Sequence, residues 1–242
     1  MSLGIDPISR KEKLCTFDCS YCQVGETQIL TDERKTFLPT KELIDEIKSL
    51  PPVKIDYITF SGRGEPTLAK NLGEMIREIR NFRKEKIAVI TNASLIDRKD
   101  VQEDLALADL VMAKLDACSE ESFTKINRPL KGITLEKTIK GIKDFRSIYK
   151  GRLELQIMFV EENKACAKDL AKLVEDISPD EVQINTPLRP SAVKPLSKQE
   201  LDGIIGYFKN VHTSYVYEAE RKMVEPISKE DTSRRRRLGI DD

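Results

Sequence analysis

Apolar residues along the chain alternate between two periodicities, which predict strands followed by helices. Short apolar runs, several with a period of two, predict strands at 54–60, 86–91, 109–115, 153–160 and 181–186, with shorter candidates at 3–8 and 214–217. Apolar residues with helical spacing predict helices at about 40–50, 75–82, 97–107, 135–149, 165–177 and 197–209. Strand and helix repeated about six times is typical of a parallel sheet with helical crossovers.

The repetition also indicates the shape of this sheet. Crossovers between parallel strands are right-handed, so repetition without reversal curls the sheet towards a barrel. A complete eight-unit barrel typically takes about 250 residues, and only about six units are recognisable here. We therefore expect an α/β fold, a partial (β/α)6 TIM-like barrel in residues 1–218. The alternative is an open doubly wound parallel sheet. In both folds ligands bind at the carboxyl ends of the strands.

Charge and hydropathy exclude some broad classes of function. The 242 residues contain 41 basic and 41 acidic side chains, so no global field favours a nucleic acid or a membrane. No apolar run approaches the roughly 18 residues of a membrane span. Nothing at the start is typical of a secretory signal, and we expect a cytoplasmic protein. Met1-Ser2 is interpreted as a cloning remnant.

Residues 219–242 form a charged C-terminal tail that we expect to be flexible. It contains four consecutive arginines, Arg234 to Arg237, and ends in two aspartates. A run of like charge is usually solvated. Contact with a nucleic-acid phosphate is conceivable, but the neighbouring acidic residues weaken it and nothing else supports it.

The main candidate for chemistry is a cysteine loop within residues 14–25. Cys15, Cys19 and Cys22 have the spacing C-x3-C-x2-C in a segment with little helix or strand pattern. Cysteines at such short spacings hold iron–sulfur clusters, and three ligands on a 4Fe-4S cluster leave one iron open. A structural zinc site would use four ligands, and the single histidine, His212, is far away in sequence. Unliganded thiols are the remaining alternative.

Two further cysteines, Cys118 and Cys166, stand alone in apolar surroundings. We expect them to be free and to behave as small hydrophobic side chains. The odd number of cysteines and the length of the chain argue against a disulfide framework.

The segment Cys-Thr-Phe-Asp-Cys-Ser-Tyr-Cys resembles the cluster loop of the radical S-adenosylmethionine (radical SAM) superfamily, including the aromatic residue before the last cysteine. The resemblance implies that S-adenosylmethionine (SAM) chelates the open iron of a 4Fe-4S cluster through its amino and carboxylate groups. Reductive cleavage of SAM would give a 5′-deoxyadenosyl radical, which abstracts hydrogen from a substrate. It also implies that Tyr21 packs near the adenine.

The segment Ser-Gly-Arg-Gly-Glu-Pro at 61–66 follows the strand predicted at 54–60. Gly62 and Gly64 permit positive φ and a close approach of the backbone to a ligand, and Glu65 could present its carboxylate to an amine. The loop resembles the Gly-Gly-Glu-Pro motif of the superfamily, whose backbone binds the amino group of SAM. Arg63 stands where that motif has glycine; it is a candidate for substrate contact.

Further candidates follow the later strands. Asn92 lies in Thr-Asn-Ala, where the superfamily often has Thr-Asn-Gly, and is expected near SAM. Lys114 and Asp116 share one face of their strand by period-two alternation; they either pair with each other or contact SAM. Gln156 is expected to face the cavity from the fifth strand, although the glycine-rich pattern that some members have there is absent. The substrate candidates are Asn127, in a polar interruption of the helical pattern, and Arg189, an anion anchor between two prolines.

Taken together, these segments resemble one broad radical SAM group of iron–sulfur oxidoreductases across about 185 residues. That group includes the archaeal tRNA wyosine-forming enzymes, which carry an additional N-terminal cysteine set that this chain lacks. We therefore expect a radical SAM enzyme of unknown substrate that takes electrons from a low-potential donor such as ferredoxin or flavodoxin. The alternatives are an RNA (tRNA) modification enzyme of the same chemistry and a non-catalytic iron–sulfur electron carrier or sensor.

Overall fold

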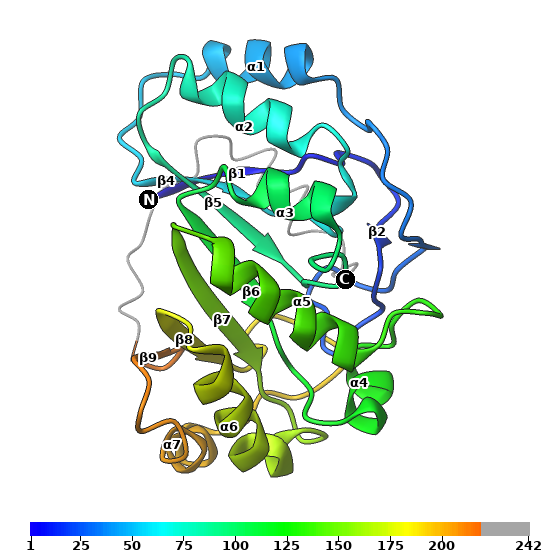
Figure 1. Cartoon of the computed structure of the whole chain (residues 1–242), viewed down its shortest axis with the longest axis vertical. Coiled ribbons are helices and arrows are strands. Elements are labelled where there is room, and N and C mark those ends of the chain that lie inside the picture. Colours follow the sequence, from blue (N-terminus) through cyan, green and yellow to red (C-terminus); the bar gives the residue numbers. More distant parts are fainter. Residues whose placement is uncertain (219–242) are drawn as a thin grey trace.

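The computed structural model describes residues 1–218, which are organised around one parallel sheet of seven strands (Figure 1). The order of the strands across the sheet is their order along the chain. The strands are β1 (Ser2–Ile5), β4 (Tyr57–Phe60), β5 (Lys86–Thr91), β6 (Leu110–Lys114), β7 (Arg152–Met158), β8 (Glu181–Asn185) and β9 (Thr213–Tyr215).

Helices connect these strands and follow one another around the sheet in Figure 1. The α-helices are α1 (Thr40–Ser49), α2 (Leu72–Arg80), α3 (Lys99–Leu105), α4 (Glu120–Ile126), α5 (Leu135–Ile148), α6 (Ala167–Ile177) and α7 (Lys198–Ile205). Two short 3-10 helices, η1 (Pro66–Leu68) and η2 (Lys164–Cys166), lie in loops that follow strands. No helix within residues 1–218 is long and apolar enough to cross a membrane.

The strand order distinguishes between the two predicted architectures. A doubly wound sheet reverses its strand order at one point and places helices on both faces. Here the order never reverses, and right-handed crossovers then place the helices on one face. The sheet stays open between β1 and β9, which lie at its two edges. The predicted partial TIM-like barrel is confirmed, and the doubly wound alternative is wrong.

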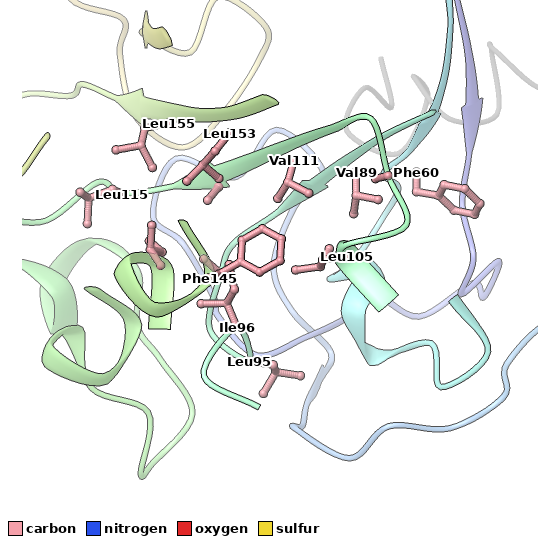
Figure 2. Packing of buried hydrophobic residues seen from close by; sticks show 14 of the residues in the cluster. Phe60, Val89, Leu95, Ile96, Leu105, Val111, Leu115, Phe145, Leu153 and Leu155 are labelled. Carbon is pink, nitrogen blue, oxygen red and sulfur yellow. The ribbon is translucent and has the colours of Figure 1, made fainter. Parts of the chain in front are cut away.

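The main core lies between the sheet and the helices. Register pairs Val89 of β5 with Val111 of β6, and Val111 with Leu153 of β7, so these fully buried side chains point to the same face. Figure 2 shows them facing Leu105 of α3 and Phe145 of α5. Their burial stabilises the fold by about 1.5–3 kcal/mol for each side chain. This core anchors the strands, so the loops at their carboxyl ends are presented from a rigid base.

Some elements differ from the predictions. The strands β2 (Leu14–Cys15) and β3 (Ile29–Leu30) form a separate two-stranded parallel sheet, and β2 lies in the cysteine loop, where little strand pattern was found. Two-residue strands are too short to give a periodic signal. The strand predicted at 54–60 begins only at Tyr57. The predicted tail, with its arginine run at 234–237, lies outside the described residues.

Candidate functional site

The cysteine loop is held against the end of α4 by its backbone. Cys15 ends β2, and the N–H groups of Asp18 and Ser20 donate to the carbonyls of Asn127 (3.1 Å) and Ile126 (2.8 Å). The N–H of Cys22 donates to the carbonyl of Cys19 at 3.1 Å, which closes a tight turn between two of the cysteines. Satisfying these backbone groups gives an irregular segment one defined conformation.

Each of the three thiols lies next to a hydrogen-bond donor, and the three donors come from different parts of the fold. Asn92, after β5, points its amide nitrogen at Cys15 Sγ (3.5 Å), and Asn127, at the end of α4, does the same for Cys19 Sγ (3.6 Å). The ammonium nitrogen of Lys13 lies 3.1 Å from Cys22 Sγ. Donors around sulfur stabilise negative charge there, which suits thiolate ligands.

The thiols are also close enough to influence one another. Burial raises the pKa of Cys15 to about 11, assisted by the carboxylate of Glu65 and by Cys22. Burial raises the pKa of Cys19 to about 12, assisted by Asp116, Cys15 and Cys22. Only thiolates ligate metal, and a bound cation replaces the thiol protons. These thiols are therefore expected to stay protonated until a metal centre binds to them.

The donor set fits a cluster better than a single metal ion. Within residues 1–218 no group of three or more His, Cys, Asp or Glu side chains is placed to hold one metal ion. A structural zinc ion requires its ligands to converge on one tetrahedral point, whereas the sulfurs on a 4Fe-4S cluster bind separate iron atoms at separate corners. Three neighbouring thiols on one loop, each with its own donor, fit the second arrangement.

The glycine loop after β4 packs directly against the cysteine loop. A Cβ on Gly64 would lie 1.9 Å from the carbonyl oxygen of Leu14, and one on Gly62 would lie 2.4 Å from the carboxyl carbon of Asp6. Neither glycine has a positive φ. The expectation of positive φ at these glycines is wrong. Glycine is needed here because the backbone of this loop lies too close to Leu14 and Asp6 to leave room for a Cβ. The N–H of Glu65 donates to the same Leu14 oxygen (3.2 Å).

The carboxylate of Glu65 is directed into the protein. It is 2% exposed, and it accepts hydrogen bonds from the N–H and hydroxyl of Thr67, the hydroxyl of Thr91 (2.6 Å) and the N–H of Asn92 (2.7 Å). The expected presentation of this carboxylate to an amine is therefore wrong, since its oxygens already have four donors. Burial raises its pKa against the opposing effect of these donors. Glu65 ties the loop after β4 to the loop after β5.

Asp116 is the centre of a second buried network, after β6. One carboxylate oxygen accepts from the N–H of Met158 (2.8 Å) and lies 3.3 Å from Lys114 Nζ. The other accepts from the hydroxyl of Tyr21 and from the side-chain amide of Asn127 (3.1 Å). Burial and the nearby carboxylate raise the pKa of Tyr21 well above its usual value. Of the two alternatives for Lys114 and Asp116, the structure has the ion pair.

Gln156 lies on the face of the sheet away from the main core. Register aligns it with Lys114 and with Gln183, and its amide group contacts both, at 3.4 Å from Lys114 Nζ and 3.3 Å from Gln183 Oε1. Half-buried polar side chains thus run across β6, β7 and β8 on this face. They lead towards the strand ends where Asp116 and the cysteine loop lie.

Three buried polar atoms in these loops have no hydrogen-bond partner: Ser20 Oγ, Arg63 Nε and Asn127 Oδ1. Ser20 lies between two of the cysteines, Arg63 beside Gly64, and Asn127 against Cys19. Burying such groups without a partner is unfavourable, so each has unused capacity for a hydrogen bond. Arg189 is exposed in the loop after β8, and no contact joins it to the others.

Sequence reasoning missed several residues of the site. Lys13 was one of 41 basic residues, with nothing to distinguish it. The hydroxyl of Thr16 accepts from Asn92 and pairs with the hydroxyl of Ser94, both at 2.7 Å, which fixes the amide that faces Cys15. Ala93 has a φ of 62° where the superfamily often has glycine. The superfamily motif indicates a turn at this position, but nothing in the sequence indicates that Thr16 and Ser94 are the hydroxyl partners.

The expectation that Cys118 and Cys166 are free is wrong, because they form a disulfide. They are 48 residues apart, but they follow the neighbouring parallel strands β6 and β7, whose ends lie side by side. The linked loops also share Asn163, whose side-chain amide donates to the carbonyl of Asp116 (2.8 Å). The disulfide thus joins two loops that support the Asp116 network.

Comparison with known proteins places the chain in a family. The model of the radical SAM superfamily matches residues 13–174. The UPF0026 protein slr1464 of Synechocystis sp. is 41% identical over 203 residues, which cover 84% of this chain and 75% of that protein. The UPF0026 protein MJ1312 of Methanocaldococcus jannaschii is 37% identical over 220 residues, covering 87% of this chain and 68% of that protein.

A solved structure shows the same fold. The crystal structure of Streptococcus suis SuiB bound to S-adenosylmethionine superposes with a TM-score of 0.68 at 16% identity, covering 89% of this chain. The matched region is 50% of the SuiB chain, so this chain spans about half the length of that protein. The cysteine loop, the partial barrel and the family match agree: the chain belongs to the radical SAM superfamily, together with UPF0026 proteins of bacteria and archaea.

Proposed function

We propose that the protein is a radical SAM enzyme that holds a 4Fe-4S cluster on Cys15, Cys19 and Cys22 and binds SAM beside it. When bound, these groups supply a one-electron reductive cleavage that yields a 5′-deoxyadenosyl radical for hydrogen abstraction from a substrate. The observation that carries the proposal is the set of three adjacent thiols at the carboxyl edge of the sheet, each facing a separate donor. Membership of the superfamily supports it.

The residues of the chain have distinct roles in this proposal. The amides of Asn92 and Asn127 orient Cys15 and Cys19 and stabilise charge on them. Glu65 does not touch the ligand; it holds the glycine loop, whose backbone is available to the amino group of SAM. Tyr21 belongs to the cysteine loop and donates its hydroxyl to Asp116, and its ring is proposed to pack near the adenine.

We assign the remaining candidates to ligand contact because they have polar groups that are not used within the protein. Arg63 and Asn127 each keep one buried polar atom for a bound molecule, and Arg63 adds a cation that suits a carboxylate or phosphate. Lys114 and Gln156 contact each other on the polar face of the sheet and are proposed to line the same ligand site. Arg189, being exposed, is proposed to contact the substrate from the rim. The electron donor is proposed to be a small low-potential protein such as ferredoxin or flavodoxin.

Anaerobic reconstitution tests the proposal. Protein loaded with iron and sulfide, reduced with dithionite and given SAM should release 5′-deoxyadenosine, measured by chromatography. Cys19→Ala should abolish both the cluster absorbance and the product. Cys118→Ala, which removes a cysteine outside the cysteine loop and breaks its disulfide with Cys166, should keep the cluster and the product.

An intact cluster without 5′-deoxyadenosine would contradict the enzymatic proposal. Calorimetry then separates the alternatives, because an electron carrier or sensor should show no heat of SAM binding. An RNA-modifying enzyme of the same chemistry should bind tRNA with an affinity that falls steeply as salt rises.

A further inference from the structure

Lys13 is a buried lysine whose ammonium group has no carboxylate partner. The residue is 3% exposed, and within residues 1–218 no acidic side chain forms an ion pair with it. Its nitrogen instead donates to the carbonyl of Gly25 (2.7 Å) and to Cys22 Sγ (3.1 Å). Lysine is almost never fully buried unless it is paired, so the absence of an ion pair with any carboxylate of residues 1–218 calls for another anion.

The backbone of Lys13 holds the side chain in this place. Its N–H donates to the side chain of Gln28 (2.7 Å), and its carbonyl accepts from the N–H of Ile29 (3.1 Å), at the start of the parallel pairing of β2 and β3. At the other end of the loop the N–H of Gly25, which has a φ of 91°, donates to the carbonyl of Cys22 (3.3 Å). The ammonium group is therefore fixed beside this thiol by two separate parts of the loop.

We propose that Lys13 is a positioning residue for the cluster, whose charge balances the anionic cluster and raises its reduction potential. The proposal rests on the proposed function, because the balancing anion is the cluster with its three thiolate ligands. Reduction adds one negative charge to that group, and a fixed cation 3.1 Å from a ligand sulfur favours the reduced state. Net charge, hydrogen bonds to sulfur and solvent exposure are the features that set such potentials.

The competing interpretation is that Lys13 only anchors the loop through the carbonyl of Gly25. The two interpretations predict different results for a variant that removes the charge but keeps a polar end on the side chain. Lys13→Gln retains a donor for that carbonyl but not the cation, whereas Lys13→Arg retains the cation. Lys11→Gln is the matched control, because Lys11 is an exposed lysine two residues earlier in the chain.

A redox titration of the reconstituted proteins, followed by electron paramagnetic resonance, measures the effect. At the midpoint potential of the wild type, Lys13→Gln should show a ratio of reduced to oxidised cluster at least about tenfold lower, which corresponds to a downward shift of about 59 mV. Lys13→Arg should keep the ratio within about threefold of the wild type, and Lys11→Gln should leave it unchanged. An unchanged potential in fully loaded Lys13→Gln would overturn the proposal.

The melting temperature of the cluster-free proteins is a second measurement. It distinguishes the two interpretations even if Lys13→Gln takes up no cluster. Without the cluster the buried charge has no anion, so Lys13→Gln should melt at or above the temperature of the wild type. A cluster-free variant that melts well below the wild type would show a loop anchor and contradict the proposal. Failure of the wild type itself to bind a cluster would instead refute the proposed function.

Discussion

Replacing Gly64 with alanine tests how the glycine loop supports the cysteine loop. The added Cβ would lie 1.9 Å from the carbonyl oxygen of Leu14 and 3.0 Å from its carbonyl carbon. This obstacle is backbone, so no side-chain rotation can relieve it. The same Leu14 oxygen accepts from the N–H of Glu65, and the next residue is Cys15, so relief of the clash displaces a proposed cluster ligand.

The size of the effect follows from the contact. Forcing extra volume into a packed site usually destabilises by about 1–3 kcal/mol, and we expect the upper end because both sides of this contact are main chain. For a protein of this size, 1 kcal/mol lowers the melting temperature by roughly 2–4 °C. Gly64→Ala should therefore melt roughly 6–12 °C below the wild type.

Thermal unfolding followed by circular dichroism, together with iron analysis after reconstitution, measures both consequences. Gly203→Ala is the matched control, because Gly203 lies within α7 and its Cβ would meet nothing within 4 Å. Alanine is favoured over glycine in a helix by about 0.5–1 kcal/mol, so the control should be slightly stabilised and fully loaded. A Gly64→Ala protein with the stability and iron content of the wild type would refute the reasoning.

Three further substitutions test the surrounding structure by urea unfolding. Cys118→Ser should lower the free energy of unfolding by about 2–4 kcal/mol under oxidising conditions, and dithiothreitol should have the same effect on the wild type and none on the variant. Tyr21→Phe removes one hydroxyl donor from the buried carboxylate of Asp116 and should cost about 1–3 kcal/mol; equal stability would show that the network adapts. Partial burial acts to raise the pKa of Asp100, but hydrogen bonds from two arginines prevail and lower it to about 2 from 3.8. The carboxylate thus adds stability above about pH 4 that is lost as the pH falls towards 2. Asp100→Asn should therefore cost less than about 1 kcal/mol at pH 7, because the carboxylate is half-exposed, and clearly less at pH 2; the same cost at both values would contradict this assignment.

The architecture could be predicted because each strand and helix carries its own periodicity. The alternation in 153–160, for example, places Leu153, Leu155 and Ile157 on one face, and all three are fully buried in β7. The pair β2 and β3 escaped prediction because its two-residue strands are held by hydrogen bonds between distant residues and not by any apolar pattern.

The predictions about individual side chains were less successful, for a physical reason. A buried carboxylate is satisfied by whichever donors the fold brings to it, and those donors lie far away in the sequence. Glu65 takes donors from Thr91 and Asn92 across two strand ends, and Asp116 takes them from Tyr21 and Asn127. Glu65 was assigned to a ligand, and Asp116 to a ligand or to Lys114, on residue type and position, yet most of their hydrogen-bonding capacity is used within the protein.

The sequence by itself determined the three candidate ligands, because the spacing of Cys15, Cys19 and Cys22 is a local property of eight consecutive residues. It also determined the repeated strand and helix pattern. Only the tertiary structure decided what surrounds each sulfur. The parallel strands bring the loops that follow them to one edge, where Asn92 and Asn127 reach the thiols, and the pairing of β2 with β3 holds Lys13 beside Cys22. Such contacts depend on distances in space, which residue type and spacing along the chain do not contain.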